Sequence, residues 1–546
     1  MPIVPRWFSR VLLALIVLAF LIRLFYWGYT GRTWEDALIT VLHSENFVHG
    51  LGLTHVTPGE PPLHGFTSPL SVLIPLVGDL FHAGFGLLFL KFVSAVCGGV
   101  AVWLGAQICL ELGLSPILAL TAGAFLAFEH QQIMWGMAGM ETEVVTVAYL
   151  FSIYCLQRGT QWQKGLSLGL IMLARPDAAI WVVIFLGIET WRAWKGGEWR
   201  RLLPVLSGLT LLYLPWLIFT FVYYGSPVPN TILAKSMGYT GVGAQLSGLA
   251  FKVKIVLLRD RFISVLTTLG PAYGGNGTGF RSLWDHRVIA RLMIFLMAVG
   301  TIAALRRRDT KALVVYAFVW TYSAYLTFLV SYIFGWYTAP IVAAAVVGSL
   351  YGLQRIVDHL LATPARERVF GIVGVVYIAS LVMILPYTIP SDRHIQKYVE
   401  AGGREQVGLY LKSVLRPGDT IGSESLGYVG YYSRGTVYDY PGLCSRKVVQ
   451  YLREHPNGRN LISMMETLQP TYINLRPAEY EDASGHSRYP WIAKDYDLVR
   501  VFRVPDAEQR QILDWQSNFD FEFDVFRAKS AAPVALERNT SSLSAK

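Results

Sequence analysis

The stretch RVLLALIVLAFLIRLFYW, residues 10–27, decides the class of this protein. It is an apolar run of about 20 residues, which is the length that an α-helix needs to cross a bilayer. The basic start of the chain, with Arg6 and Arg10, is typical of a signal peptide. However, the run is too long for one, and no small-residue cleavage site follows it. We therefore expect an uncleaved first membrane span.

The composition extends this expectation to most of the chain. The 546 residues are 53% hydrophobic and 15% charged, with a mean hydropathy of +0.41. A soluble domain carries about 25% charged residues, so the bulk of this chain is integral to a membrane. The four cysteines, Cys97, Cys109, Cys155 and Cys444, have neither the spacing of a zinc site nor that of a disulfide framework.

Apolar runs predict eleven spans in a mostly α-helical bundle. They are placed near 8–27, 87–110, 115–132, 141–157, 165–176, 177–194, 202–222, 287–305, 312–331, 337–355 and 369–388. The segment 68–82 is left out. It contains proline, and its uninterrupted apolar run is only about ten residues long. Such a short run favours an interfacial or re-entrant helix within a first outer loop, residues 28–86.

Basic residues set the expected orientation. Lys and Arg of short loops lie on the cytoplasmic side. With eleven spans and a cytoplasmic N-terminus, the inner loops carry the basic clusters within 158–164, 192–201, 306–311 and 355–368. The net charge of +10 is then explained by topology, so it does not indicate nucleic-acid binding. We expect a multi-pass membrane protein with a cytoplasmic N-terminus.

This topology gathers the unusual polar motifs on the extracytoplasmic face. They are WEDALI (34–39), GFTSPL (65–70), GMETE (139–143), ARPD (174–177), YYGSPVPNTILAK (223–235) and FGWYTAP (334–340). Separate motifs that converge on one side indicate a single site. Residues 1–390 are therefore expected to form one transmembrane module that carries this site.

A second domain follows the spans. Residues 391–505 alternate helical and strand-like patterns, with a helical run in 394–415 and strands or strand–turn pieces in 419–433, 436–443, 471–477 and 496–504. This pattern predicts an extracytoplasmic α/β domain. The composition of 506–546 predicts a C-terminal tail that is largely disordered.

The acidic residues of the motifs allow two interpretations. Asp36, Thr40 and His43 share one face of the helix expected after the first span. Asp36 is either a carboxylate favoured by the helix dipole or a group that works with Glu35, as a cation ligand or a general base. Glu141 and its neighbour Glu143 begin a span, where carboxylates usually face a cavity or a partner.

The basic residues of the motifs are also open to more than one interpretation. Arg175 either binds a phosphate, which a guanidinium contacts with two hydrogen bonds, or pairs with Asp177 or Glu141. Lys235 is a second phosphate candidate, and Asn230 is a candidate cap for a following helix, although the segment could equally be a plain structural loop.

Two further features argue against other kinds of site. His43, His49, His55 and His64 match no metal-binding spacing. The glycine-rich GGNGTG, residues 274–279, lacks the lysine of a P-loop and does not indicate nucleotide binding.

In this order, the motifs resemble integral-membrane glycosyltransferases of the GT-C superfamily. Within that superfamily they resemble bacterial terminal arabinofuranosyltransferases of cell-wall polysaccharides, which implies a multi-pass protein of a bacterial plasma (inner) membrane. It rests on EDALI (35–39), GFTSPL, Gly139–Thr142, Arg175–Asp177, Tyr223–Lys235, Gly427–Ser433 and Val437–Leu443. The family often has Asp–Asp where this chain has Glu35–Asp36, so Asp36 is the better catalytic candidate.

The resemblance implies transfer of a sugar, such as the pentofuranose arabinofuranose, from a polyprenyl-phosphate donor to a cell-envelope glycan or glycolipid. Asp36 and Glu35 would then be catalytic, and Arg175 and Lys235 would bind the donor phosphate. The expected substrate-binding residues are Glu141, Thr67, Asn230, His43 and Tyr337. A divalent cation, Mg²⁺ or Mn²⁺, could be held by Glu35, Asp36 and Glu141.

Two other classes of function compete with this one. A transporter or flippase of lipid-linked sugars would place polar residues through the bilayer depth and often shows internal duplication, and the sequence has neither. A sensor or scaffold would use the outer domain as its working part, and then Asp36 would be dispensable.

Overall fold

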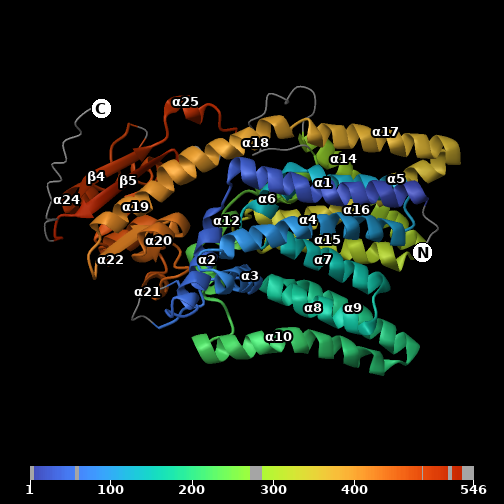
Figure 1. Ribbon diagram of the computed structural model, residues 1–546, viewed down its shortest axis with the longest axis horizontal. Coiled ribbons are helices and arrows are strands. Elements are labelled where there is room, and N and C mark those ends of the chain that lie inside the picture. Colours follow the sequence, from blue (N-terminus) through green and yellow to red (C-terminus); the bar gives the residue numbers. More distant parts are fainter. Residues whose placement is uncertain (1–4, 56–60, 271–285, 483, 514–518, 532–546) are drawn as a thin grey trace.

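The structure is a computed structural model and describes residues 5–55, 61–270, 286–482, 484–513 and 519–531. A helical bundle makes up the chain to about residue 390, and a smaller α/β domain follows at one end of it (Figure 1). The GGNGTG segment lies outside the described residues.

The bundle is built from long helices and several short ones. In its first half these are α1 (Arg6–Thr30), α2 (Glu35–Val48), α3 (Leu70–Phe81), α4 (Gly86–Glu111), α5 (Pro116–Phe128), α6 (His130–Met137), α7 (Thr142–Arg158), α8 (Gln161–Ala174), α9 (Ala179–Gly196) and α10 (Leu202–Tyr224). The second half contains α11 (Asn230–Gly238), α12 (Val242–Leu246), α13 (Phe251–Val265), α14 (His286–Arg307), α15 (Thr310–Phe328), α16 (Gly335–Leu360), α17 (Thr363–Val382) and α18 (Leu385–His394). Single 3₁₀ turns lie at Pro176–Ala178, Trp199–Arg201 and Thr267–Leu269.

Each predicted span overlaps one main helix of the bundle, and the predicted spans 115–132 and 369–388 also run into the next helices, α6 and α18. The helices concerned are α1, α4, α5, α7, α8, α9, α10, α14, α15, α16 and α17. Within the described residues, six helices are long and apolar enough to cross a membrane, namely α1, α4, α10, α14, α16 and the helical run that begins with α17. The protein is therefore a polytopic helical membrane protein, while the count of eleven spans stays a prediction.

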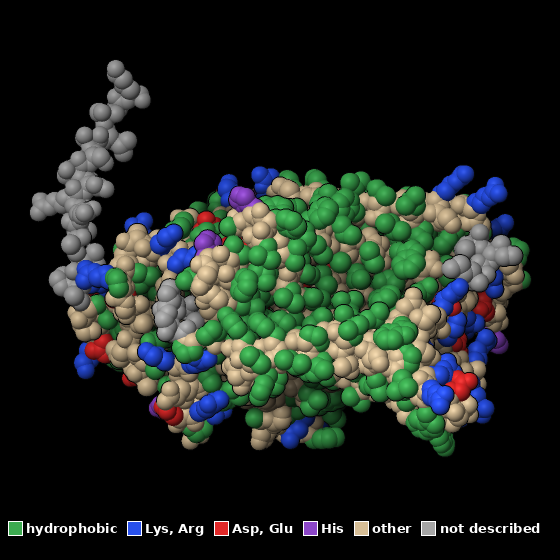
Figure 2. Space-filling view, turned by 60° about the horizontal axis from the view of Figure 1, so that its bottom comes forward, with side chains coloured by type: hydrophobic (Ala, Val, Ile, Leu, Met, Phe, Trp, Pro, Cys, Tyr) green, Lys and Arg blue, Asp and Glu red, His purple; other side chains and the backbone are tan. Residues whose placement is uncertain are grey.

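The surface of the bundle is that of a lipid-facing protein. Figure 2 shows apolar side chains across the middle of the molecule, with Lys and Arg gathered toward the two ends. Large apolar side chains such as Leu13 on α1 and Phe221 on α10 are more than half exposed. In contrast, α16 is almost fully buried and forms the centre of the bundle.

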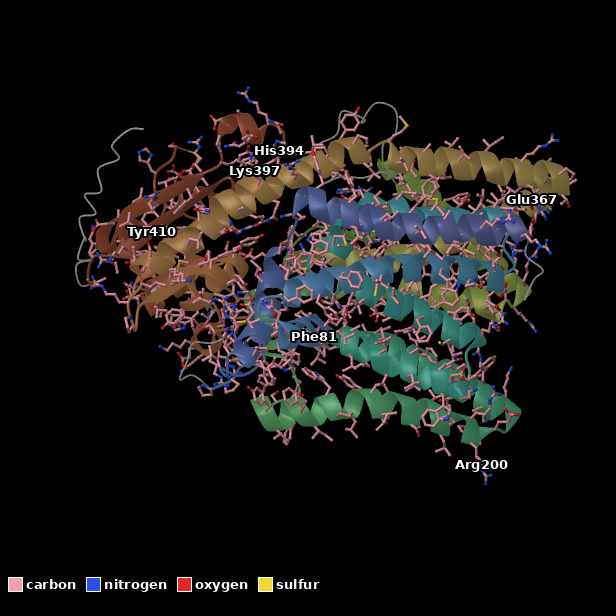
Figure 3. All side chains as sticks on the ribbon, in the orientation of Figure 1. Phe81, Arg200, Glu367, His394, Lys397 and Tyr410 are labelled. Atoms are coloured by element: carbon pink, nitrogen blue, oxygen red, sulfur yellow. The ribbon has the colours of Figure 1, made fainter. Side chains whose placement is uncertain are left out.

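The two ends of the bundle differ. Arg200, in one of the predicted cytoplasmic loops, lies at the end that is away from the α/β domain, as does Glu367 (Figure 3). The opposite end carries α2, α3 and the α/β domain (Figure 1). The assignment of these two ends to the cytoplasmic and extracytoplasmic sides stays a prediction.

Helix α3 is the segment that was expected not to span. It has 12 residues, which correspond to about 18 Å of helix, and Pro75 lies inside it. Its Asp79 is buried and accepts hydrogen bonds from the Ser44 hydroxyl (2.6 Å) and the Gly86 amide (2.7 Å). The helix is thereby fixed against α2 and the start of α4.

A continuous helical run leads out of the bundle into the α/β domain. It starts with α17, continues through α18 and the π-helix Ile395–Arg404, and ends with α19 (Glu405–Val414). The sheet has the order β2-β1-β3-β5-β4, in which β2, β1 and β3 are parallel and β5 is antiparallel to both its neighbours. The strands are β1 (Thr420–Ser423), β2 (Thr436–Asp439), β3 (Tyr472–Leu475), β4 (Tyr496–Arg503) and β5 (Glu522–Ala528). The helices that accompany them are α20 (Leu426–Ser433), α21 (Arg446–Glu454), α22 (Leu461–Leu468), α23 (Pro477–Tyr480), α24 (Pro490–Asp495) and α25 (Asp506–Gln509).

Two sequence predictions for this domain are wrong in part. The segment 419–433 is a strand only in β1, and its second half is helix α20, in which Leu426 and Val429 are buried at helical spacing. The predicted tail 506–546 contains β5, whose Phe523 and Val525 are buried in the sheet. The domain therefore extends beyond residue 505.

Candidate functional site

Six of the predicted site residues line one cavity of ≈ 560 Å³. They are Asp36, Thr67, Glu141, Arg175, Lys235 and Tyr337. They come from the start of α2, the loop before α3, the start of α7, the end of α8, α11 and the start of α16. The convergence of separate motifs that the sequence predicts is thus present, at the end of the bundle next to the α/β domain (Figure 1).

The acidic side of the cavity is formed by two carboxylates. Asp36 lies in the first turn of α2. Burial raises the pKa of its carboxyl above the ordinary value, while the positive charge of Lys235 opposes that shift. Glu141 precedes α7 and lies within electrostatic range of Arg175 and Asp36. A buried carboxylate with a raised pKa is a stronger base than one in water.

The basic side is organised by Tyr337. The Arg175 guanidinium lies 4.5 Å above the centre of the Tyr337 ring, and the Lys235 ammonium donates to the Tyr337 hydroxyl at 3.4 Å. Burial lowers the pKa of Lys235, but neighbouring Tyr337 and Asp36 more than reverse this and raise it, so the ammonium stays charged. One aromatic side chain therefore holds two cations at the cavity.

Arg175 also makes one of the ion pairs that the sequence left open. Its Nε lies 2.8 Å from Oδ1 of Asp177, and Nη2 lies 3.4 Å from Oδ2. The pairing with Asp177 does not remove Arg175 from the cavity, since the side chain still lines it. Glu143 has a separate partner, Arg23 of α1, at 3.0 Å, as a buried carboxylate inside a bundle requires.

A second cavity of ≈ 1020 Å³ adjoins the first. The two share Thr67, Arg175, Thr231, Lys235 and Tyr337. Beyond these residues the second cavity has a largely apolar wall, made by Ile232, Tyr325, Leu326, Leu329, Val330, Tyr332 and Phe334. Arg175 and Lys235 thus lie where the two cavities meet. Below, the first cavity, which contains Asp36 and Glu141, is called the polar chamber, and the second is called the apolar groove.

Glu35 does not line the cavity, contrary to the prediction. Its carboxylate accepts a hydrogen bond from the Gly427 amide at 3.1 Å and lies 3.7 Å from Nε of Arg404, both in the α/β domain. Successive side chains of a helix point about 100° apart, and here that rotation directs Asp36 into the cavity and Glu35 toward the α/β domain. Glu35 joins the two domains instead.

The predicted metal set is not assembled for the same reason. Among the described residues, no three His, Cys, Asp or Glu side chains form a group that could hold a metal ion. Because Glu35 turns to the α/β domain, Asp36 and Glu141 are the two members of the set that remain at the cavity.

Asn230 and His43 also lie outside the cavity. Asn230 does not cap α11, and its side-chain amide donates to the carbonyls of Gly442 (2.8 Å) and Leu443 (2.9 Å). His43 donates through Nδ1 to the Ile39 carbonyl at 2.7 Å. Burial lowers the pKa of His43 to about 4, so its ring is neutral and acts as part of the packing.

Several lining residues were missed by the sequence reasoning. They are Ile39, Thr40, Gly65, Phe66, Ser68, Ser71, Met140, Thr231, Trp336 and Leu443. Most lie inside or directly beside the motifs that were singled out, and the Thr231 hydroxyl is hydrogen-bonded to the Thr67 hydroxyl at 2.8 Å. Leu443 belongs to the α/β domain, and its signal was its place at the end of the Val437–Leu443 segment that carries the resemblance.

One family of known proteins matches the C-terminal part of the sequence. Residues 393–523 match a family described as a domain of unknown function, DUF8728. No curated protein matches the sequence.

Two solved structures resemble the whole arrangement. ArnT from Cupriavidus metallidurans in the apo state aligns with 95% of this chain and 97% of its own, at 12% identity and a TM-score of 0.53. The Archaeoglobus fulgidus oligosaccharyltransferase in complex with Zn and sulfate aligns with 85% of this chain and 68% of its own, at 12% identity and a TM-score of 0.52. The chain therefore has the GT-C-like fold, a polytopic helical bundle with a C-terminal α/β domain.

Proposed function

We propose that this protein is a glycosyltransferase that moves a sugar from a polyprenyl-phosphate donor to a cell-envelope glycan or glycolipid. The observation that carries the proposal is the cavity in which Asp36 and Glu141 face Arg175 and Lys235. The GT-C-like fold supports it. One structural neighbour is named as an oligosaccharyltransferase, and the other, ArnT, shares the fold. The motif order favours a pentofuranose such as arabinofuranose as the sugar.

The donor fits the two adjoining cavities. Arg175 and Lys235 at the junction would hold the phosphate, because guanidinium and ammonium groups bind phosphate oxygens. The apolar groove beyond them, with Leu329 and Val330, suits the first isoprene units of the carrier. The sugar would then lie in the polar chamber beside Asp36.

The chemistry follows from that placement. The acceptor hydroxyl oxygen forms a bond to the anomeric carbon while the bond from that carbon to the phosphate oxygen breaks. Asp36 takes the hydroxyl proton as general base, and its raised pKa suits that role. The phosphate leaves with the bonding electrons, and the two cations stabilise its charge, so a general acid is not required.

The topology proposal accompanies the function. The N-terminus would be cytoplasmic and the α/β domain extracytoplasmic, in a bacterial plasma membrane. The carrier lipid would then reach the site from the outer leaflet, and the acceptor would reach it from the aqueous side.

The test is direct. Purified protein is incubated with a panel of polyprenyl-phosphate sugars and n-octyl glycoside acceptors, with and without EDTA, and products are identified by mass spectrometry. We expect a glycosylated acceptor with one donor of the panel, and the EDTA arm reports any need for a divalent cation. Movement of intact donor across a proteoliposome bilayer, with no glycosylated product from any donor, would replace this proposal with a flippase.

A further inference from the structure

We propose that the loop Asp439–Cys444 of the α/β domain forms the acceptor-binding wall of the active site, with Leu443 as the residue that contacts the acceptor. This inference rests on the proposed function and names a part of the same site. The loop follows β2, at the carboxyl end of a parallel strand. It belongs to the motif Val437–Leu443, to which the chemistry described above gives no role.

Leu443 enters the polar chamber from outside the membrane module. It lines the cavity that contains Asp36 and Glu141, and it is the only lining residue there that the described α/β domain contributes. Its side chain is half-buried, so part of its apolar surface is open to the chamber. Leu443 lines the same cavity as Asp36, Glu141 and Thr67, so it offers an apolar surface there for the apolar face of a sugar ring.

The loop is held in place from two sides. From within, the Asp439 carboxylate accepts hydrogen bonds from the amides of Leu443 (2.5 Å) and Cys444 (3.1 Å). From the membrane module, the Asn230 side chain donates to the carbonyls of Gly442 and Leu443. Gly442 has a φ of +94°, a conformation that glycine adopts without strain, so the chain can turn sharply here.

A third contact fixes the loop against the chamber itself. The Cys444 thiol donates to the carbonyl of Gly65 at 3.4 Å, and Gly65 lines the same cavity. Asn230 begins α11, the helix that carries Lys235. The position of Leu443 is thus set relative to the proposed phosphate site by direct hydrogen bonds.

The arrangement of the two cavities assigns the loop to the acceptor. The apolar groove that suits the carrier lipid leaves the chamber past Arg175 and Lys235, and its lining contains no residue of the described α/β domain. Leu443 lines only the part that is not shared with the groove, beside Asp36. A group that attacks the anomeric carbon must come from this side, because the phosphate occupies the other.

The experiment separates acceptor from donor kinetics. Using n-octyl glycosides of arabinofuranose and mannose as acceptors, we expect Leu443→Ala to lower kcat/KM for the acceptor about tenfold or more, since lost apolar contacts discriminate at that level. The donor KM should change by less than about twofold. Leu443→Met, which conserves volume, should restore most of the acceptor kcat/KM.

Asn230→Asp supplies a second, independent variant. It keeps the shape of the side chain but sets a carboxylate against two carbonyls, so the loop should move and acceptor kcat/KM should fall in the same way. The matched control is Leu409→Ala, at an exposed leucine on α19, which should change neither constant. Apparent Tm and size-exclusion profiles verify that each variant is folded.

Two outcomes are distinguishable. If the wild-type protein transfers sugar but folded Leu443→Ala and Asn230→Asp keep the acceptor kcat/KM of the wild type, the assignment of the loop is wrong and the proposed function stands. If the wild-type protein transfers no sugar from any donor of the panel, the proposed function itself fails.

Discussion

Asp36 and Glu35 are neighbours in the sequence, yet they serve different parts of the molecule. The helical rotation of about 100° per residue turns Asp36 into the cavity and Glu35 toward Gly427 and Arg404 of the α/β domain. Only Asp36 is therefore placed to accept a proton from a hydroxyl group in the chamber. The two carboxylates provide a matched pair for testing the proposed chemistry.

Asp36→Asn should abolish most sugar transfer. Asparagine keeps the size of the side chain but cannot act as a base, and loss of a general base costs about 10²–10⁴-fold in rate. Glu35→Gln should lose much less activity, because its oxygen can still accept the Gly427 amide hydrogen bond. Initial rates of product formation measure both variants, and equal losses in the two would show that Asp36 has no special role.

The sequence predicted six of the sixteen described residues that line the cavity. Asp36, Glu141, Arg175 and Lys235 were found because charged groups next to apolar runs are costly and stand out. Asn230 was misjudged, because its partners Gly442 and Leu443 lie about two hundred residues away along the chain. A sequence shows which side chain is unusual, whereas the tertiary fold decides what that side chain faces.

The long helices were predictable from the sequence, whereas the short elements were predicted only in part. The long apolar helices were placed from hydropathy alone, because a run of about 20 apolar residues allows few alternatives. The four-residue strands β2 and β3 were predicted, whereas helix α20, with eight residues, and strand β5, with seven, were missed. Short elements take their conformation from the surfaces they pack on, here α2 and α19 for α20 and the strand β3 for β5.

The contact between α20 and α2 leads to a prediction for Gly427. A Cβ at this position would overlap the backbone of Glu35, which cannot move without shifting α2. Gly427→Ala should therefore separate the two helices, lower stability by about 1–3 kcal/mol and reduce sugar transfer through displacement of Asp36. Apparent Tm and initial rate are the measurements. The control is Gly243→Ala in α12, where an added Cβ meets no atom within 4 Å.

Asp439 makes the stability of its loop depend on pH. Burial raises the pKa of this carboxyl from 3.8 to about 7, although the amides of Cys444 and Leu443 oppose the shift. Between these two values the folded protein keeps a proton that the unfolded chain has lost. This contribution to stability is complete below pH 3.8 and is lost as the pH rises through 7.

The prediction concerns the difference between two variants. The apparent Tm of the wild-type protein should fall as the pH rises from about 5 to 8, and Asp439→Asn should reduce that fall, because it removes the titrating group. Asp497→Asn, at an exposed aspartate of β4, should leave the pH dependence as in the wild type. If the apparent Tm of Asp439→Asn fell with pH as much as that of the wild type, Asp439 would not be the group that makes stability depend on pH.

A series of ion pairs, in which arginines and acidic residues alternate, joins the membrane module to the α/β domain. Arg32, just after α1, pairs with Glu400 (2.8 Å), and Glu400 also pairs with Arg404 (2.7 Å). Arg404 pairs in turn with Asp520 (2.8 Å), which lies 2.7 Å from Arg476. The series starts in the membrane module and ends in the sheet domain. These ion pairs fix the position of the α/β domain, whose Leu443 lines the cavity.

Arg404→Met therefore tests whether the two domains act as one unit. It leaves the carboxylates of Glu400 and Asp520 buried with one partner fewer each, and we expect a loss of about 3 kcal/mol, at the low end for a broken buried pair because each acid keeps another arginine. Sugar transfer should fall with it, since the position of Leu443 relative to α2 would no longer be fixed.

Arg404→Lys keeps the charge but not the geometry of a guanidinium, so it should lie between wild type and Arg404→Met in apparent Tm and in rate. Arg503→Met, at an arginine that is more than half exposed and also pairs with two acids, is the control that should change neither. An Arg404→Met protein that melts and transfers sugar like the wild type would mean that the domains are held together by their apolar contacts, and that the chain of charges has no part in assembling the site.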